Sequence, residues 1–572
     1  MRLLAVLLAL LPLSGLHAAW RKDIQPESLV QPIRDTIALW ESPKKGSEPP
    51  SDLAIAVEAP VAIFDTLKAL GYYDPEVSLL KDDDSWVLRV QGGQPVRVGQ
   101  VSVEWLGEAA DDRLLRRLEF PLKTGDVLDQ VRYEAFKQTL SERMLERGYF
   151  DAEWLVTDIA LDLQARRADI TLRHDSGMRY RFGDILFLDS LGQPLTGLDA
   201  RWLRAMTPFK PGDEISSRRI TALQKTLQAS RYFADVRVTL LRDQAEGRDV
   251  ALEVRADTRK PNRMAVGLGY ATDEGPRVSH EWQRHLLNTR GHGISTELQL
   301  SPVRQQADLR YRIPWKHPVE DSLQFLAGLQ RDRIDDTLNT QTVVGVQRVI
   351  QPPRGWQTTY GLRLSEDRFE RDGGERGSTT LLMPSVAWSL VENRGGALDP
   401  LSGHRQLLQI QAAHPQAFSD AEFVSVRAGS RWLTTVAERH MLLLRADAGA
   451  IVSPRFAEVP PSVRFYAGGD SSVRGYDYRA LSPVNADGDT VGGQYLVTGS
   501  IEYNWRWRPA WRPAVFLDAG NAFDAHWQPL AIGAGAGLRW ISPVGPVRVD
   551  VASAVSEPGH PLRLHITLGS PL

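Results

Sequence analysis

A segment rich in glycine and charge, FYAGGDSSVRGYDYRA at residues 465–480, holds the residues of this sequence best suited to a specific interaction. Its mixture of glycines, acids, arginines and aromatic residues fits neither an alternating strand nor a disordered loop. We expect a turn in which Gly475 gives the backbone its freedom and Arg474 is presented to a carboxylate. The residues of this turn are Val473, Arg474, Gly475 and Tyr476. Because an unpaired buried guanidinium is costly, we predict an ion pair between Arg474 and Asp518.

Two strand-like segments downstream form the predicted wall for this turn. Alternation in AVFLDAGNAF, residues 514–523, turns three residues inward, namely Phe516, Asp518 and Gly520. Alternation in AIGAGAGLRWIS, residues 531–542, gives the same face a row of glycines, Gly533, Gly535 and Gly537. A row of glycines removes side chains from a place where another backbone can lie close. The turn is therefore predicted to pack on this wall.

The elements that must position these residues are strands. From residue 262 to 572 apolar and polar residues alternate with a period of 2, as in SIEYNWRW at 500–507, and no helical pattern intervenes. This pattern favours an antiparallel barrel, and aromatic residues at strand ends are typical of barrels in outer membranes. A soluble β-sandwich would alternate in the same way. With about ten residues per strand plus turns, the segment allows about sixteen strands.

The N-terminus indicates export. Residues 1–19 start with one basic residue, continue with an apolar run and end in Ala18 and Ala19, which is the layout of a cleaved signal peptide. After residue 20 no apolar stretch is long enough for a transmembrane helix. The net charge of −3 gives no basic footprint for nucleic acid, and the absence of cysteine excludes disulfides.

An imperfect repeat precedes the predicted barrel. LKALGYYDPEV (67–77), MLERGYFDAEW (144–154) and LQASRYFADVRV (227–238) each end an apolar helical stretch with an aromatic residue pair and continue as an extended run. We predict three small α+β domains at 20–96, 97–178 and 179–261, followed by the barrel at 262–572. A repeated unit without a catalytic residue at a fixed place is more often a docking module than an enzyme.

These segments resemble a known family. FYAGGDSSVRGY, FLDAG and RWISPVGPVRVDVA are similar to the signature of the outer-membrane assembly factors of the BamA/TamA superfamily. The three repeats resemble its polypeptide-transport-associated (POTRA) modules, and ALGYYDPEV, YRFG and PFKPGDE are most similar to the TamA branch. The resemblance implies a sixteen-stranded outer-membrane barrel, periplasmic domains POTRA 1, POTRA 2 and POTRA 3, and a sixth extracellular loop folded into the lumen by Arg474.

The resemblance also implies partners. Nascent outer-membrane proteins, such as autotransporter-like clients, would insert near the seam between the first and last strands of the barrel. POTRA 1 would contact an inner-membrane-anchored, periplasm-spanning partner of the TamB type. The barrel itself would contact the lipid bilayer.

The seam can be placed in the sequence from the strand pattern. We expect the first strand, MAVGLGYA at 264–271, to pair weakly with the last strand, LRLHITLG at 562–569. The seam residues that we single out are Gly267, Gly269, Leu564, Ile566 and Leu568. Glycines weaken the packing of a strand, and unpaired backbone groups can accept an incoming strand.

Two other functions fit the same plan. A secretion pore of the two-partner type shares repeats and barrel, although three repeats and the absence of a plug helix before them favour the assembly factor. A passive porin would need neither the repeats nor an inserted loop. GAGAG lacks the spacing of a nucleotide fingerprint and the histidines are scattered, so we predict no enzymatic activity, no cofactor and no metal.

Overall fold

The computed structural model of the protein describes residues 19–41, 51–83, 85–113, 115, 117–334, 337–371, 376–396, 399–485, 488, 490–542 and 545–568. The predicted signal peptide, except for Ala19, lies outside these residues. None of the described helices is both long and apolar enough to cross a bilayer. The chain forms two compact units, and the second consists of residues 187–208, 222–238 and 254–572.

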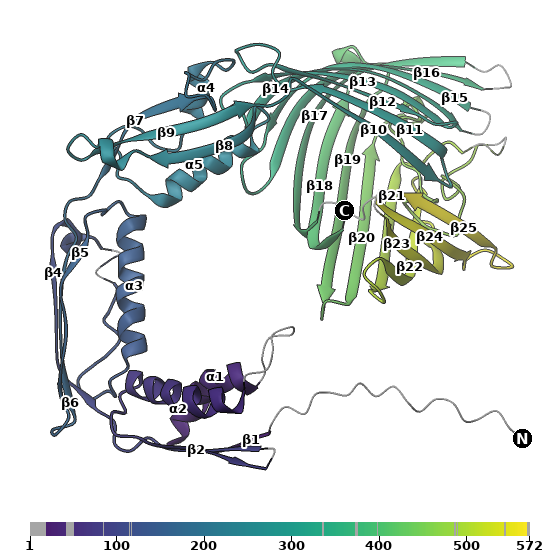
Figure 1. The fold of residues 1–572 in the computed structure, drawn as a ribbon. Coiled ribbons are helices and arrows are strands. Elements are labelled where there is room, and N and C mark those ends of the chain that lie inside the picture. Colours follow the sequence, from purple (N-terminus) through teal and green to yellow (C-terminus); the bar gives the residue numbers. More distant parts are fainter. Residues whose placement is uncertain are drawn as a thin grey trace, which may run out of the picture. The chain divides into compact units, whose positions relative to one another are not determined.

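Three small three-stranded sheets come first in the chain (Figure 1). The first has the strand order β1-β3-β2 and contains β1 (Ala19–Gln25), β2 (Glu76–Asp82), β3 (Ser85–Gln91), α1 (Val30–Glu41) and α2 (Asp52–Ala69). The second has the order β4-β6-β5 and contains β4 (Arg97–Leu106), β5 (Glu153–Asp162), β6 (Arg167–Asp175) and α3 (Gln130–Glu146). The third has the order β7-β9-β8 and contains β7 (Arg181–Leu188), β8 (Phe233–Leu240), β9 (Asp249–Thr258), α4 (Ala200–Ala205) and α5 (Ser217–Ala229).

Capping and apolar spacing explain the longer helices of these repeats. Ser51 caps α2 and Asp129 caps α3, each by accepting a hydrogen bond from a backbone N–H of the first turn. The buried face of α3 consists of Tyr133, Phe136, Leu140 and Met144, at the spacing of one helical stripe. The first aromatic residue of each repeated pair is also buried, at Tyr72, Tyr149 and Tyr232. These aromatic side chains therefore belong to the cores of the repeats.

Sixteen strands in chain order close into one antiparallel barrel, shown in teal through green to yellow in Figure 1. The first eight are β10 (Asn262–Ala271), β11 (Gly275–Arg284), β12 (Gly293–Leu300), β13 (Arg304–Pro314), β14 (Asp321–Ile334), β15 (Thr337–Ile350), β16 (Gln357–Arg371) and β17 (Arg376–Gly395). The last eight are β18 (Pro400–Ala413), β19 (Phe423–Val436), β20 (His440–Val452), β21 (Tyr495–Trp505), β22 (Trp511–Phe523), β23 (Ala531–Ser542), β24 (Gly545–Ala554) and β25 (Leu562–Leu568). Short 3₁₀ turns lie at Glu27–Leu29, Glu108–Asp111, Arg242–Gln244, Pro415–Ala417 and Phe456–Glu458.

The predicted fold class, α+β repeats followed by an antiparallel barrel of about sixteen strands, is confirmed. Alternation gives the barrel an apolar outer face, on which Met264, Val266 and Leu268 are 68%, 72% and 79% exposed. Polar residues fill the other face, as in β21, where Glu502 and Asn504 are buried between exposed neighbours. The polar lumen therefore follows directly from the period of 2.

Part of the third repeat is fixed to the turn between β11 and β12. The Tyr232 hydroxyl donates to the backbone carbonyl of Gly291 at 3.1 Å. The indole N–H of Trp202 donates to the backbone carbonyl of Arg290 at 2.8 Å. The backbone N–H of Asp199 donates to the carbonyl of Thr289 at 2.8 Å. A repeat aromatic residue thus packs in the core and also anchors a barrel turn.

Candidate functional site: an inserted loop and the barrel seam

The connection between β20 and β21 returns into the barrel and buries its turn. Val473 is fully buried, Tyr476 is 2% exposed and Arg474 is 3% exposed. Val473 and Tyr476 form an apolar cluster with Ala531 of β23 and Ala554 of β24. A surface loop would leave such a turn in solvent, so the position of this loop depends on the wall that it meets.

Arg474 binds Asp518 through three hydrogen bonds. Its Nε donates to Oδ2 at 2.7 Å, its Nη2 donates to Oδ1 at 3.0 Å and its backbone N–H donates to Oδ2 at 3.1 Å. The carboxylate of Asp518 is fully buried, and the guanidinium carbon lies 3.4 Å from the centre of the Phe516 ring. This two-point contact between a planar guanidinium and a carboxylate fixes orientation as well as charge.

Two further carboxylates share the same guanidinium. The Nη1 of Arg474 donates to Glu502 of β21 at 2.7 Å and to Asp550 of β24 at 3.1 Å. Arg539 of β23 binds both of these acids as well, with 3.0 Å between its Nη2 and Glu502. Arg445 of β20 lies 3.7 Å from Asp518. Arg474 is therefore one member of a network in which each buried acid has a second basic neighbour.

The glycines of the row face either the inserted loop or the neighbouring strands. A Cβ on Gly533 would overlap the backbone carbonyl of Arg474, so this position admits the loop backbone only because it lacks a side chain. Side chains at Gly535 and Gly537 would instead meet Phe516 and Asp550 and the backbone of β24. Gly520 faces Thr498 and Val497 on the neighbouring strand. Gly533 is thus the glycine of the row that contacts the loop backbone.

Gly475 links the inserted turn to the last strand. It has a positive φ of 98°, and its N–H donates to Nε2 of His565 at 2.9 Å. The Nδ1 of the same imidazole contacts Asp470 of the loop. A neutral imidazole that accepts at Nε2 carries its proton on Nδ1, so His565 donates to Asp470.

The loop also bonds to the turn between β10 and β11. The N–H of Asp470 donates to Asp273 at 2.6 Å, and the N–H of Asp273 donates back to Asp470 at 3.4 Å. Burial, followed by the charge of Asp470, raises the pKa of Asp273 to about 6. Asp273, Asp470 and His565 offer donor atoms within 4.8 Å of one another. The imidazole nitrogen that faces the carboxylates already carries a proton, however, so this group acts as a hydrogen-bonded link between loop, first turn and last strand.

The two strands at the seam barely pair within the described part of the chain. Ala271 of β10 faces Thr567 of β25, and the Thr272 hydroxyl accepts from the Ile566 N–H at 2.7 Å. By contrast, β24 and β25 pair continuously from Val547–Leu568 to Ser553–Leu562. The predicted seam residues lie on the two strands that meet here, Gly267 and Gly269 on β10 and Leu564, Ile566 and Leu568 on β25. Within the described residues, none of these five is paired with another across the seam.

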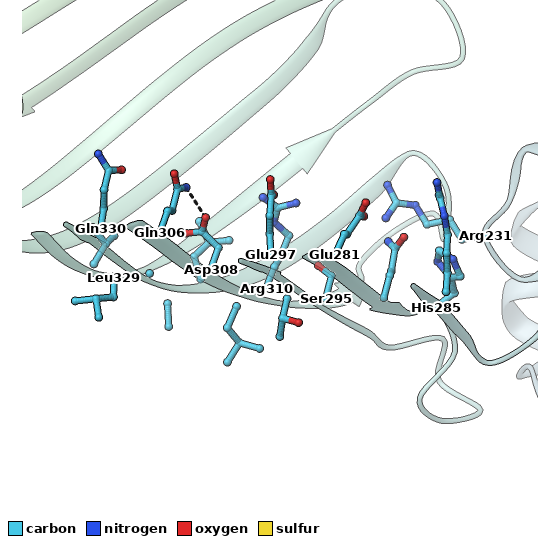
Figure 2. A pocket seen from close by; sticks show the side chains of 18 of the residues that line it. Arg231, Glu281, His285, Ser295, Glu297, Gln306, Asp308, Arg310, Leu329 and Gln330 are labelled. Atoms are coloured by element: carbon cyan, nitrogen blue, oxygen red, sulfur yellow. Dashed lines mark hydrogen bonds between the residues drawn. The ribbon is translucent and has the colours of Figure 1, made fainter. Parts of the chain in front are cut away.

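A polar pocket of about 750 Å³ lies beside the start of β10. Figure 2 shows Glu281, Glu297 and Asp308 on the same side of their strands, with Leu329 on the other side. Arg231 and His285 lie together at one end of the pocket. The period-2 pattern explains the polar strand residues, whereas Arg231 comes from the third repeat.

The sequence pattern led to Arg474, Asp518 and the glycine row but missed much of their surroundings. Glu502 and Asp550 had the same signal as Asp518, an acid at an inward position of an alternating strand. Nothing in the local pattern indicated that His565 and Asp273 meet in space, because they lie at opposite ends of the barrel sequence.

Comparison with known proteins fits this geometry. A family model described as the Omp85 superfamily domain matches residues 287–570. Residues 287–570 therefore form an Omp85 superfamily domain. A second family model, POTRA, matches residues 96–177. Its description is surface antigen variable number repeat. The chain is accordingly an outer-membrane barrel whose POTRA domains lie in the periplasm, as predicted.

Two curated relatives share the name outer membrane protein assembly factor BamA. This chain is 25% identical to that of Nitratidesulfovibrio vulgaris over 363 residues, which covers 60% of this chain and 46% of the relative. It is 22% identical to that of Neorickettsia risticii over 547 residues, which covers 86% of this chain and 69% of the relative. The match thus spans less than half the length of the first relative, and the similarity to the TamA branch stays a prediction.

One solved structure shows the fold that this chain shares. BamA from Haemophilus ducreyi lacking POTRA domains 1–3 aligns with a TM-score of 0.68 at 15% identity, covering 83% of this chain and 99% of that chain. At this identity the likeness concerns the fold alone. It agrees with the order of small mixed repeats before a closed barrel.

Proposed function

We propose that this chain is an outer-membrane protein assembly factor that promotes the folding and insertion of client barrels at the seam between β10 and β25. The observation that carries the proposal is the short contact between these strands within residues 262–568 as described, Ala271 with Thr567, where the other neighbouring strands pair along their lengths. Backbone groups at an open strand edge can hydrogen-bond an extended polypeptide. The activity is physical and requires neither a nucleotide nor a catalytic residue.

The inserted loop supports this function. Asp470 connects the loop to Asp273 beside the first strand and to His565 on the last strand, so the loop bridges the two sides of the seam. Arg474 ties the same loop to β21, β22 and β24. Side-chain contacts through this loop therefore add to the direct contacts of Ala271 and Thr272 with β25 in holding the barrel closed near the seam. Such contacts can exchange without unfolding the strands, which suits a seam that opens for a client.

The seam is tested with paired cysteines. Ala271→Cys with Thr567→Cys places the two thiols at the registered contact. We expect the oxidised variant to stop inserting an autotransporter barrel into liposomes and to recover on reduction, because the locked seam cannot admit a strand. The control is Val549→Cys with Ile566→Cys, a registered pair between β24 and β25. Full activity of the oxidised seam variant would refute the proposal.

We propose further that the first repeat docks an inner-membrane-anchored, periplasm-spanning partner of the TamB type. Helix α2 carries an apolar stripe on its exposed face, where Leu53, Val57 and Val61 are 75%, 60% and 59% exposed. Residues four apart lie on one side of a helix, so the three side chains form one surface. Such a stripe suits a protein partner better than water.

This docking is tested by pull-down of the TamB-type protein with the full-length chain. Val57→Glu should abolish capture because it places a charge in the apolar stripe. Val131→Glu, on α3 of the second repeat and also 60% exposed in the native chain, is the matched control. Equal capture by both variants would exclude α2 as the docking surface.

A further inference from the structure

Three arginines gather where β10 begins. Arg259 and Arg263 flank the first residue of the strand, Asn262, and Arg231 approaches from the turn after α5. All three line the pocket beside the strand together with His285, and Figure 2 shows Arg231 and His285 at one end of it. Across the part of the chain that the structure describes, none of the three guanidinium groups forms an ion pair. This end of the pocket therefore carries positive charge without a bound acid.

Residues around these three arginines add further positive charge at this end of the pocket. Burial, and then the charges of Arg312 and Arg310, lowers the pKa of Arg231. Burial, and then the three arginines at the start of β10, lowers the pKa of His285. The Nδ1 of His285 is buried and has no hydrogen-bond partner among the described residues. Glu281 attracts Arg231 across the pocket but does not pair with it. A further negative group at this end would offset the repulsion.

The direction of the strands determines which group arrives there. Both described neighbours of β10 run antiparallel to it. A polypeptide added to β10 in the antiparallel direction, like these neighbours, runs toward Asn262. Its C-terminal end therefore reaches the arginines. A parallel strand would instead bring an N-terminal ammonium group to the same place, and the arginines would repel it.

We propose that Arg259 and Arg263, assisted by Arg231, form a binding site for the C-terminal carboxylate of a polypeptide strand added to β10. This inference rests on the proposed function, because it requires that β10 accepts a strand. The site selects the antiparallel direction of the added strand and stops its register where the carboxylate meets the guanidinium groups. Guanidinium groups suit this role, since they bind carboxylates through two parallel hydrogen bonds.

The test uses a synthetic peptide with the sequence of the last strand, LRLHITL, labelled at its N-terminus and prepared with either a free carboxylate or an amide at its C-terminus. Fluorescence anisotropy with the full-length protein in detergent measures both dissociation constants. We expect the carboxylate peptide to bind about tenfold more tightly, which corresponds to about 1.4 kcal/mol. Arg263→Gln should remove this preference while the affinity for the amide peptide stays unchanged.

The matched control is Arg310→Gln, which removes the same charge from the same pocket on β13. It should keep the preference for the carboxylate. Equal binding of the two peptides to the unmodified protein, or an equal loss of preference in both variants, would overturn the carboxylate site while leaving strand addition intact. Failure of both peptides to bind would overturn the site together with the proposed strand acceptance at β10.

Discussion

Replacement of Arg474 by alanine tests how the loop is held inside the barrel. The guanidinium group is almost fully buried and binds Asp518, Glu502 and Asp550 at 2.7 to 3.1 Å. Its removal leaves Asp518 with Arg445 alone, at 3.7 Å, as a charged neighbour. Removing one partner of a buried ion pair typically costs about 3 to 5 kcal/mol, whereas an exposed pair contributes less than about 1 kcal/mol.

Replacement of Asp518 by alanine is expected to destabilise the protein less than replacement of Arg474. In Asp518→Ala the guanidinium keeps Glu502 and Asp550, so we expect a smaller loss of roughly 1 to 3 kcal/mol. In the double variant neither group is left without its main partner. Its loss should therefore fall below the sum of the single losses by at least about 1 kcal/mol.

The assay is urea unfolding of the full-length protein in detergent, followed by tryptophan fluorescence. Proteolysis reports loop position independently, because a released loop exposes the bond after Arg479 to trypsin. For the urea measurement the control is Arg479→Ala, since Arg479 lies in the same loop and its guanidinium group lies over the rings of Tyr466 and Tyr478. Additive single losses, or a loss under about 1 kcal/mol for Arg474→Ala, would refute the description of a loop anchored by this ion pair.

Three further predictions follow from the same geometry. Gly533→Ala should displace the loop, because the new methyl group would overlap the Arg474 carbonyl, and trypsin sensitivity of the loop would reveal the change. The pKa of Asp273 is raised to about 6 in the folded protein, so its contribution to holding the loop is fully present below about pH 4 and is lost as the pH rises through 6. Amide hydrogens near Asp470 should therefore exchange more slowly at pH 5 than at pH 7.5, once the exchange rates are corrected for the intrinsic effect of pH. Asp273→Asn should abolish that pH effect, and its persistence would contradict the assignment. Residues 262–572 alone should form a heat-modifiable barrel, and substantial helix in the circular dichroism spectrum of this fragment would contradict the prediction.

The sequence by itself determined the architecture, because each level of it rests on a local period. Alternation with a period of 2 specifies which side chains face lipid, and it placed Phe516 and Asp518 on the inner face before any contact was known. The repeated helix ends with aromatic pairs specified three small mixed domains, and Tyr72, Tyr149 and Tyr232 are buried in them. These features depend on neighbours within a few residues, so a linear pattern contains them.

Only the tertiary structure decided which inward groups meet. Closing the barrel brings Asp273 near its beginning next to His565 near its end, and the returning loop inserts Asp470 between them. The same closure makes Arg474 contact three carboxylates on three strands, where the sequence suggested one. The physical reason is that strand shear and loop path set these contacts, and both are properties of the closed barrel as a whole.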